Sequence, residues 1–201
     1  MSPEFLLTTF IVCITPGIGV IYTLSSALGG GVRAGFWASV GCTIATVLHL
    51  IIAVAGLAAV LLASAVLFQT VKYAGVLYLI WMSWAVLKGS GGLDIRPSAP
   101  ASPANIVTRG ILLNILNPKI PLFFAAFLPQ FLPHEGATVA QMVELGAVFS
   151  AMTFVTFMLY AVVAASGRKA ILSSERVMLW MRRVFAASFA ALGLRLAMER
   201  V

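Results

Sequence analysis

The sequence predicts an all-α membrane protein with six transmembrane helices, arranged as two inverted repeats of three helices each. Three observations predict this fold class. The chain has 201 residues, of which 61% are hydrophobic and 9% charged, with a mean hydropathy of +1.05. A soluble domain is about half apolar and a quarter charged, so water could not solvate this surface. Six apolar segments approach or exceed the length of about 20 residues that spans a bilayer. A linker rich in glycine, serine and proline separates them into two groups of three.

Short connectors separate the six predicted spans. The spans run approximately Phe5–Leu28, Phe36–Leu62, Phe68–Leu87, Gly110–Leu132, Val139–Ser166 and Val184–Met198. Gly29-Gly30-Gly31 ends the first span, and the turn Pro133–Gly136 separates the fourth from the fifth. The sixth span is the shortest and contains Arg195, whose long side chain would extend to the membrane surface. The basic connector before it, residues 168–183, carries Ser173-Ser174-Glu175, which predicts the start of a short interfacial helix.

The linker between the third and fourth spans sets the organisation of the chain. Residues 89–104 have the composition of a flexible linker, so we expect one transmembrane domain over 1–201. Its first repeat covers about 1–88 and its second about 105–201. Three spans in each half invert the second half relative to the first. Spans one and four then become equivalent and cross the bilayer in opposite directions, as in transporters built from inverted repeats.

The formal charge of +7 falls mainly in the connectors. Those after the first, third and fifth spans carry Arg33, then Lys88, Arg96 and Arg109, then Arg168, Lys169, Arg176, Arg182 and Arg183. The opposite side has Lys72, Arg195 and Arg200. Because cytoplasmic loops carry the excess of Lys and Arg, both termini are predicted to face away from the cytoplasm. The expected surroundings are membrane lipids, and no nucleic-acid partner is expected.

The most informative feature is a proline near the centre of each of two spans. In the first span, Thr15 can cap a helix and Pro16 is favoured at a first helical position, so the pair predicts a helix start inside the membrane. Pro16 would leave the carbonyl of Val12 without its usual amide partner. Gly17 permits a close backbone approach. The new helix N-terminus would offer its amides to an anion such as a carboxylate.

The fourth span repeats this pattern. Asn117 is a strong helix cap, Pro118 follows it, and the carbonyl of Asn114 would be freed. Asn114 and Asn117 are three residues apart, so their side chains share one helix face and offer the acceptors that an ammonium group needs. Two capped half-helices at one depth could therefore hold a zwitterion. The alternative is a pair of ordinary proline kinks, but two centred breaks in corresponding positions favour a substrate site.

Two ionisable residues lie deep within predicted spans, where such residues are costly and are candidates for a function. His49, in the second span, could carry a proton, or it could be a neutral packing histidine. Lys119 follows the second break and could attract a carboxylate, lose its proton when desolvated, or extend to the membrane surface. No span has a carboxylate at its centre, so a proton relay of paired acids is not expected.

Other functions find little support in the sequence. It has no His-Glu-x-x-His motif, Gly-x-Ser-x-Gly motif or phosphate-binding loop, so we expect neither an enzyme nor a cofactor. A metal-ion or other small-solute exporter is the alternative function. Its candidate soft ligands are Cys13, Cys42 and His49, and no metal site is predicted from them. A non-transporting scaffold is the third class.

Small residues recur at four-residue spacing in three of the spans. The pairs are Gly41 with Ala45, Gly146 with Ser150, and Ala186 with Ala190. Such pairs let membrane helices approach closely. We expect them to pack helices within the monomer, and they leave a homo-oligomer open.

Several motifs resemble those of the LysE/RhtB family of amino-acid exporters. They cover nearly the whole chain: Thr15-Pro16-Gly17, Arg33-Ala34-Gly35, Tyr73–Leu79, Gly110–Lys119, Phe127–Phe131 and Leu192–Leu196. The Asn-x-x-Asn-Pro-Lys stretch that ends at Lys119 is the most specific part. The resemblance implies a six-helix carrier in the bacterial inner membrane that exports amino acids or close derivatives and uses proton-motive force. Periplasmic termini follow from this location and the charge distribution.

The sequence departs from the family pattern at two places. Ile18 stands where the family's usual Pro-Gly-Pro motif has its last proline, and Ala45-Thr46 stands where the family often has Gly-Asp before the histidine. Without that acid, a smaller or less polar amino acid is expected rather than a cationic one. The expected substrate-binding residues are Thr15, Pro16, Gly17, Asn114, Asn117, Pro118 and Lys119. His49 is the candidate for proton coupling, a hypothesis that the family pattern does not supply.

Overall fold

The computed structural model describes residues 1–15, 17–60, 101–117, 119–133, 138–167 and 175–198, together with residues 73, 76, 77, 80, 81, 83, 84, 87 and 88. Pro16 and Pro118 lie outside the described residues. So do much of the predicted third span, Phe68–Leu87, and most of the linker. Within the described part of the chain every regular element is a helix, which confirms the all-α class.

The helices fall close to the predicted spans, with several ends displaced. They are α1 (Pro3–Ile14), α2 (Ile18–Val60), α4 (Pro103–Ile115), α5 (Lys119–Ala126), the 3₁₀ helix η1 (Leu128–Phe131), α6 (Val139–Ser166) and α8 (Glu175–Met198). The fifth predicted span coincides with α6, which begins at a capping box formed by Thr138 and Gln141. The first predicted span is divided between α1 and α2, and the fourth among α4, α5 and η1.

Two helices begin earlier than the hydrophobic pattern predicts. Helix α4 begins at Pro103 rather than at Gly110, because the Ser102 hydroxyl accepts a hydrogen bond from the Asn105 amide at 3.3 Å and caps the new helix. The arginine of its second turn, Arg109, therefore lies on a helix and not in a connector. Helix α8 runs from Glu175 to Met198 without interruption. A helix thus begins at Glu175, as the Ser173-Ser174-Glu175 pattern predicts, but it is long and continuous with the sixth predicted span.

A sharp kink divides α2 into two limbs. Gly30 has φ −122° and ψ 17°, and Gly31 has φ 70° and ψ −169°, a conformation that favours glycine. The glycine run thus ends the first span, as predicted, and the chain reverses into a second limb over residues 32–60. Two described stretches are long and apolar enough to cross a membrane. They are Ile18–Gly56, which includes the kink, and Val139–Ser166.

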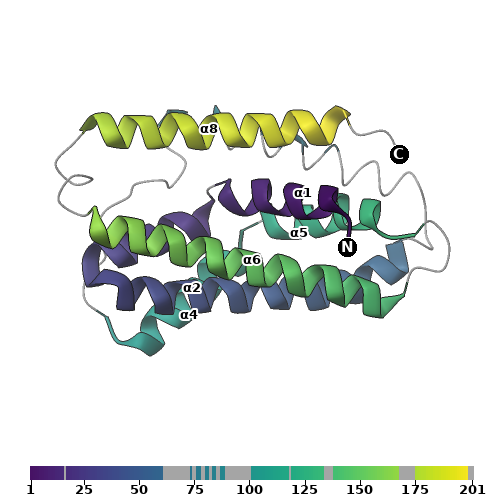
Figure 1. Ribbon diagram of the computed structural model, residues 1–201, viewed down its shortest axis with the longest axis horizontal. Helices are drawn as coiled ribbons and strands as arrows, with labels where there is room; N and C mark the ends of the chain where they lie inside the picture. The colour runs from purple at the N-terminus through teal and green to yellow at the C-terminus, as the bar shows by residue number, and fades with distance from the viewer. Residues whose placement is uncertain are drawn as a thin grey trace.

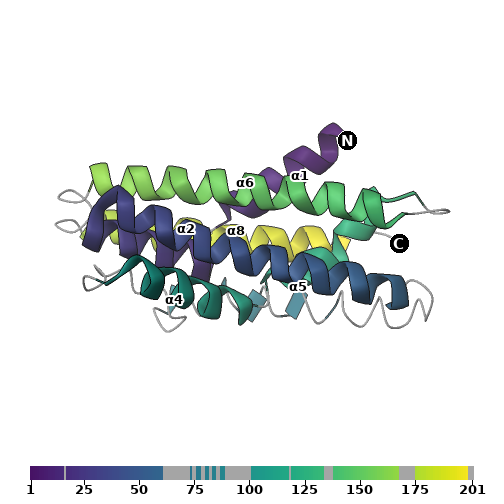
Figure 2. The same ribbon diagram turned by 90° about the horizontal axis from the view of Figure 1, so that it is seen from below.

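The helices lie roughly parallel to one long axis (Figure 1). The N-terminus and the last turn of α8 lie toward one end of the molecule, and the α2 kink, the start of α4 and the start of α8 lie toward the other (Figures 1 and 2). Helix α1 runs toward the kink, whereas α4 and α5 run away from it. The two divided segments therefore run in opposite directions and meet in the middle of the molecule.

Small residues bring α2, α4 and α6 into close contact. A Cβ added at Gly41 would overlap the carbonyl oxygen of Val107 on α4, and one at Gly110 would lie 3.2 Å from the carbonyl oxygen of Ala38. A Cβ added at Gly146 on α6 would overlap the side chain of Leu50. These contacts confirm that Gly41 and Gly146 pack helices within the monomer.

Because the Val107 contact is between main chains, we expect Gly41→Ala to destabilise the protein. The added methyl group would force α2 and α4 apart, at a cost of about 1–3 kcal/mol for overpacking. Gly56→Ala on the same helix is the control, since a Cβ added there meets nothing within 4 Å. Thermal unfolding of the purified protein in detergent should show a lower melting temperature for Gly41→Ala alone. Equal melting temperatures would contradict this account of the helix contact.

Candidate functional site

The two interruptions face each other in the interior. Helix α1 ends at Ile14 and α2 begins at Ile18, while α4 ends at Ile115 and α5 begins at Lys119. A Cβ added at Gly17 would lie 3.4 Å from Lys119 Cδ and 3.6 Å from Asn117 Nδ2. Lys119, Asn117 and Thr15 are all buried. The structure therefore brings the residues of the two predicted breaks into one cluster.

Lys119 closes the open end of α1. Its Nζ donates a hydrogen bond to the carbonyl oxygen of Val12 at 2.7 Å and another to the carbonyl oxygen of Thr15. The Val12 carbonyl is the one that Pro16 was predicted to free. The side chain is only 7% exposed, so it does not extend to a membrane surface. A cation is also favoured here because the C-terminus of a helix carries a partial negative charge.

Side chains satisfy most of the other terminal carbonyls of α1. The Thr15 hydroxyl and amide both donate to the carbonyl oxygen of Ile11, at 2.7 Å and 2.9 Å. The Tyr160 hydroxyl of α6 donates to the carbonyl oxygen of Ile14 at 2.7 Å. Thr15 therefore ends α1 instead of capping α2, and the helix start predicted at Thr15-Pro16 lies instead at Ile18. The hydroxyl reaches the Ile11 carbonyl in the last turn of α1, and the non-helical Gly17 precedes the start of α2 at Ile18.

Asn117 caps α5 as predicted. Its Oδ1 accepts a hydrogen bond from the Lys119 amide at 3.1 Å, the contact expected of a helix N-cap. Its Nδ2 donates to Asn114 Oδ1 at 3.1 Å, so the two asparagines do share one face. The second break is thus a capped helix start that presents Lys119 to the end of α1.

Asn114 joins the second break to α2. It is fully buried, and its Nδ2 donates to the carbonyl oxygen of Cys42 at 2.8 Å and to Thr46 Oγ1 at 3.4 Å. A Cβ added at Gly19 would lie 2.9 Å from Asn114 Oδ1, so this close approach requires glycine. Sequence reasoning missed Thr46 and Tyr160 as neighbours of the site. Thr46 had a usable signal, because it lies one helical turn before His49.

His49 reaches the cluster through the main chain of Asn114. Its Nε2 lies 3.3 Å from the Asn114 carbonyl oxygen, the second carbonyl that a proline was predicted to free. The Asn117 amide also donates to this oxygen, at 3.1 Å. His49 is buried and no contact places it against Lys119 within the described residues. Of the two deep ionisable residues, Lys119 is thus the one seated between the breaks.

The space at the breaks is nearly closed. A cavity of about 10 Å³ remains there, lined by polar residues of both breaks and by apolar side chains of α2, α5 and α6, including Val20, Ile120, Phe149 and Phe157. Phe149 also stacks on Phe123 of α5 with ring centroids 4.4 Å apart, which packs α5 against α6. Pockets that bind small molecules commonly measure about 300–1,000 Å³, so this arrangement leaves no room for an amino acid.

The candidate metal ligands do not converge in the structure. Cys13 Sγ lies 3.3 Å from Thr153 Oγ1, and Cys42 Sγ contacts the carbonyl oxygens of Gly19 and Gly110. Both thiols are free and buried. Within the described ranges, no three His, Cys, Asp or Glu residues are placed to hold a metal ion. The alternative of a metal-ion exporter is therefore not favoured.

Comparison with known proteins identifies the family. Residues 10–200 match the family model of the LysE type translocator. The homoserine/homoserine lactone efflux protein of Salmonella typhi is 27% identical over 197 residues, which cover 98% of this chain and 95% of the relative. The leucine efflux protein of Enterobacter sp. (strain 638) is 32% identical over 132 residues, 64% of this chain and 62% of the relative. No solved structure matches the chain.

The family of the matching model is one of translocators rather than enzymes. The match confirms the resemblance found in the sequence motifs. The chain belongs to the LysE type translocator family.

Proposed function

We propose that this protein is a secondary active transporter that exports amino acids or close derivatives across the bacterial inner membrane, driven by proton-motive force. The observation that carries the proposal is the buried ammonium of Lys119, held by carbonyls of a broken helix opposite a second, capped break. Membership of a translocator family and the names of the relatives, which concern homoserine and leucine efflux, support amino acids as cargo.

The proposed architecture is one domain over 1–201, with six spans in two inverted three-helix repeats. The opposite directions of α1 and of α4 with α5 support this, as do the breaks that both segments share (Figure 1). The end of the molecule with the α2 kink would face the cytoplasm, and both termini would face the periplasm. Paired broken helices that meet near the bilayer midplane would form the substrate site.

In the proposed mechanism the substrate exchanges places with Lys119. The ammonium of an amino acid would take over the carbonyls of Val12 and Thr15, and its carboxylate would pair with the released Lys119. The amide of Asn117 and the N-terminus of α5 would also face the carboxylate. Because buried charges are costly unless they are paired, this exchange would leave no charge alone. It would also separate α1 from α5, and so couple binding to the movement of one repeat against the other.

The cargo would be small or apolar. Val20, Ile120, Phe149 and Phe157 surround the junction, and they suit an aliphatic side chain. Thr46 stands where related sequences often have an acid, so a cationic side chain would meet Lys119 without a compensating carboxylate. Thr15, Pro16, Gly17, Asn114, Asn117, Pro118 and Lys119 would line the opened site. His49 would carry the coupled proton, because its contact with the Asn114 carbonyl links it to the second break.

We expect Lys119→Met to reduce export by at least tenfold, because the variant lacks the group that pairs with the substrate carboxylate. Uptake of labelled L-leucine and L-homoserine into everted vesicles measures the loss, with membrane content checked by immunoblot. Lys88→Met is the matched control, since Lys88 lies over the Trp84 ring at 4.2 Å and outside the site. Wild-type export by a fully inserted Lys119→Met protein would overturn the proposed role.

The His49→Gln variant should still exchange L-leucine across the membrane but should no longer accumulate it. Glutamine can still donate to the Asn114 carbonyl but does not titrate, so the site should form without a proton carrier. We expect exchange of labelled for unlabelled L-leucine across proteoliposomes to stay within about threefold of wild type. Accumulation driven by an imposed pH gradient should be lost. Gradient-driven accumulation equal to wild type would show that His49 does not couple the proton.

A further inference from the structure

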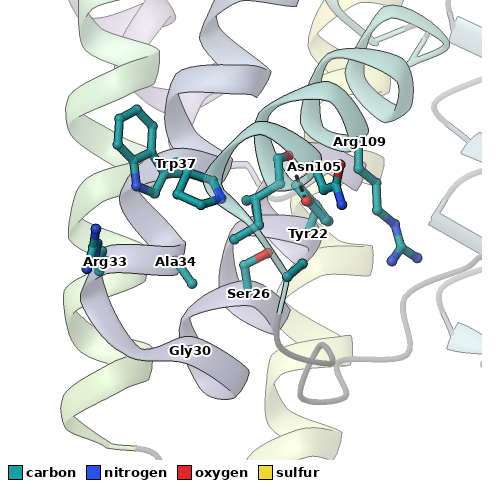
Figure 3. Close-up of a pocket in the computed structure, with 11 residues that line it drawn as sticks. Tyr22, Ser26, Gly30, Arg33, Ala34, Trp37, Asn105 and Arg109 are labelled. Carbon is teal, nitrogen blue, oxygen red and sulfur yellow. Dashed lines mark hydrogen bonds between the residues drawn. The ribbon is translucent and has the colours of Figure 1, made fainter.

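A second and much larger cavity lies between the α2 kink and the first turns of α4 (Figure 3). Its volume is about 550 Å³, against about 10 Å³ at the breaks. Pockets that bind small molecules commonly measure about 300–1,000 Å³. The cavity is therefore large enough for an amino acid in the same conformation in which the central site is closed.

The floor of the cavity contains polar groups that lack partners. Ser26 is 2% exposed, and its hydroxyl makes no hydrogen bond among the described residues, although it lies near the hydroxyl of Tyr22. The Tyr22 hydroxyl instead donates to the carbonyl oxygen of Ile106 at 2.8 Å. The indole Nε1 of Trp37, which also lines the cavity, is a buried donor without an acceptor in the described part of the chain. Both atoms are buried beneath the lining of the cavity, so a guest would first meet the side chains of the rim.

The rim of the cavity is basic. Arg33 and Arg109 line it from two different helices and are both exposed. Figure 3 places Arg33 beside Trp37 on one side, and Arg109 beside Asn105 on the other. The guanidinium of Arg109 lies 5.9 Å from the ring centroid of Tyr22. None of the described residues that line the cavity is acidic.

The guanidinium groups of the rim select an oxyanion. Arginine binds a carboxylate through two parallel hydrogen bonds. The apolar faces of Trp37, Tyr22 and Ile106 complete the walls, and they suit an aliphatic side chain. The chemistry of the cavity therefore fits a small carboxylate with an apolar body. The phosphate of an anionic lipid headgroup offers the same oxyanion chemistry.

The position of the cavity relates it to the breaks. Ile106 precedes Asn114 by eight residues on α4, which is about 12 Å along the helix. Tyr22 lies about one turn after the start of α2 at Ile18. Helices α2 and α4 thus contribute to both the cavity and the closed junction. The cavity lies toward the end of the molecule that the basic residues assign to the cytoplasm, where an exported molecule arrives first.

We propose that this cavity is a loading site whose basic rim, formed by Arg33 and Arg109, attracts and binds the carboxylate of the amino-acid cargo before the cargo reaches the broken helices. The inference rests on the proposed export function and adds a second substrate site to it. Loss of the loading site weakens capture from the cytoplasm and leaves the later exchange at Lys119 intact.

The test uses the full-length protein with L-leucine and L-homoserine as probes. In everted vesicles, the double variant Arg33→Gln/Arg109→Gln should raise the apparent KM for transport about tenfold or more, with Vmax within about twofold of wild type. Arg183→Gln, an exposed arginine of α8 away from the cavity, is the matched control. Restoring positive charge with Arg33→Lys/Arg109→Lys should recover part of the affinity. An unchanged KM in the double glutamine variant would overturn the loading site.

Equilibrium binding in detergent separates this proposal from the export function and from lipid binding. We expect labelled L-leucine to bind the wild-type protein, and leucinamide, which lacks the carboxylate, to compete at least tenfold less well. Arginine-dependent binding without any export would support the site and contradict the export function. Export that is indifferent to both arginines would contradict the site alone. Phosphatidylglycerol retained by the wild type but lost by the double glutamine variant, with unchanged L-leucine binding, would assign the cavity to lipid instead.

Discussion

The structure depends on one requirement: main-chain carbonyls freed inside an apolar interior must find donors. Two helices of this protein are interrupted, and the groups that satisfy each interruption come largely from elsewhere in the chain. Lys119, from the second break, donates to the carbonyls of Val12 and Thr15 at the first. His49 of α2 approaches the carbonyl of Asn114 at the second. Neither break therefore satisfies its carbonyls with its own residues alone. The hydrogen bonds between the breaks also hold the two halves of the chain together.

This mutual dependence explains why the central site is closed when no guest is present. The positive charge that a substrate carboxylate would need is already stabilised by carbonyls, so the ammonium of the empty site has hydrogen-bond acceptors. A zwitterion offers both an ammonium for those carbonyls and a carboxylate for Lys119. A molecule with only one of these groups would leave a charge or a carbonyl without a partner. In the proposed function, specificity for the amino-acid backbone therefore arises from the same hydrogen bonds that stabilise the closed state.

Sequence reasoning could locate both breaks, because proline, its preceding cap residue and the span length are local signals. It also identified Val12 and Asn114 as the carbonyls at risk, and Asn117 as a cap. It could not find the partners of these groups, since Lys119 and Tyr160 reach α1 only through tertiary packing. The role of Thr15 was misassigned because a threonine hydroxyl can satisfy either the helix before it or the helix after it, and the sequence alone does not choose. The start of α4 was missed because its first two turns are too polar to resemble a membrane span. In the structure the Ser102 cap is enough to begin the helix at Pro103.

The two cavities would carry out different steps of the proposed export, and these steps need sites with different properties. A site that captures its substrate from water must be open and wide, whereas a site that exchanges a buried ammonium must exclude water, which would otherwise compete for the carbonyls. Arg33 and Arg109 are exposed and remain hydrated, so a carboxylate there is attracted without a large desolvation cost. Lys119 is buried, and its pairing is correspondingly strong and selective. Capture at the rim followed by exchange at the breaks lets attraction and discrimination be set by different residues.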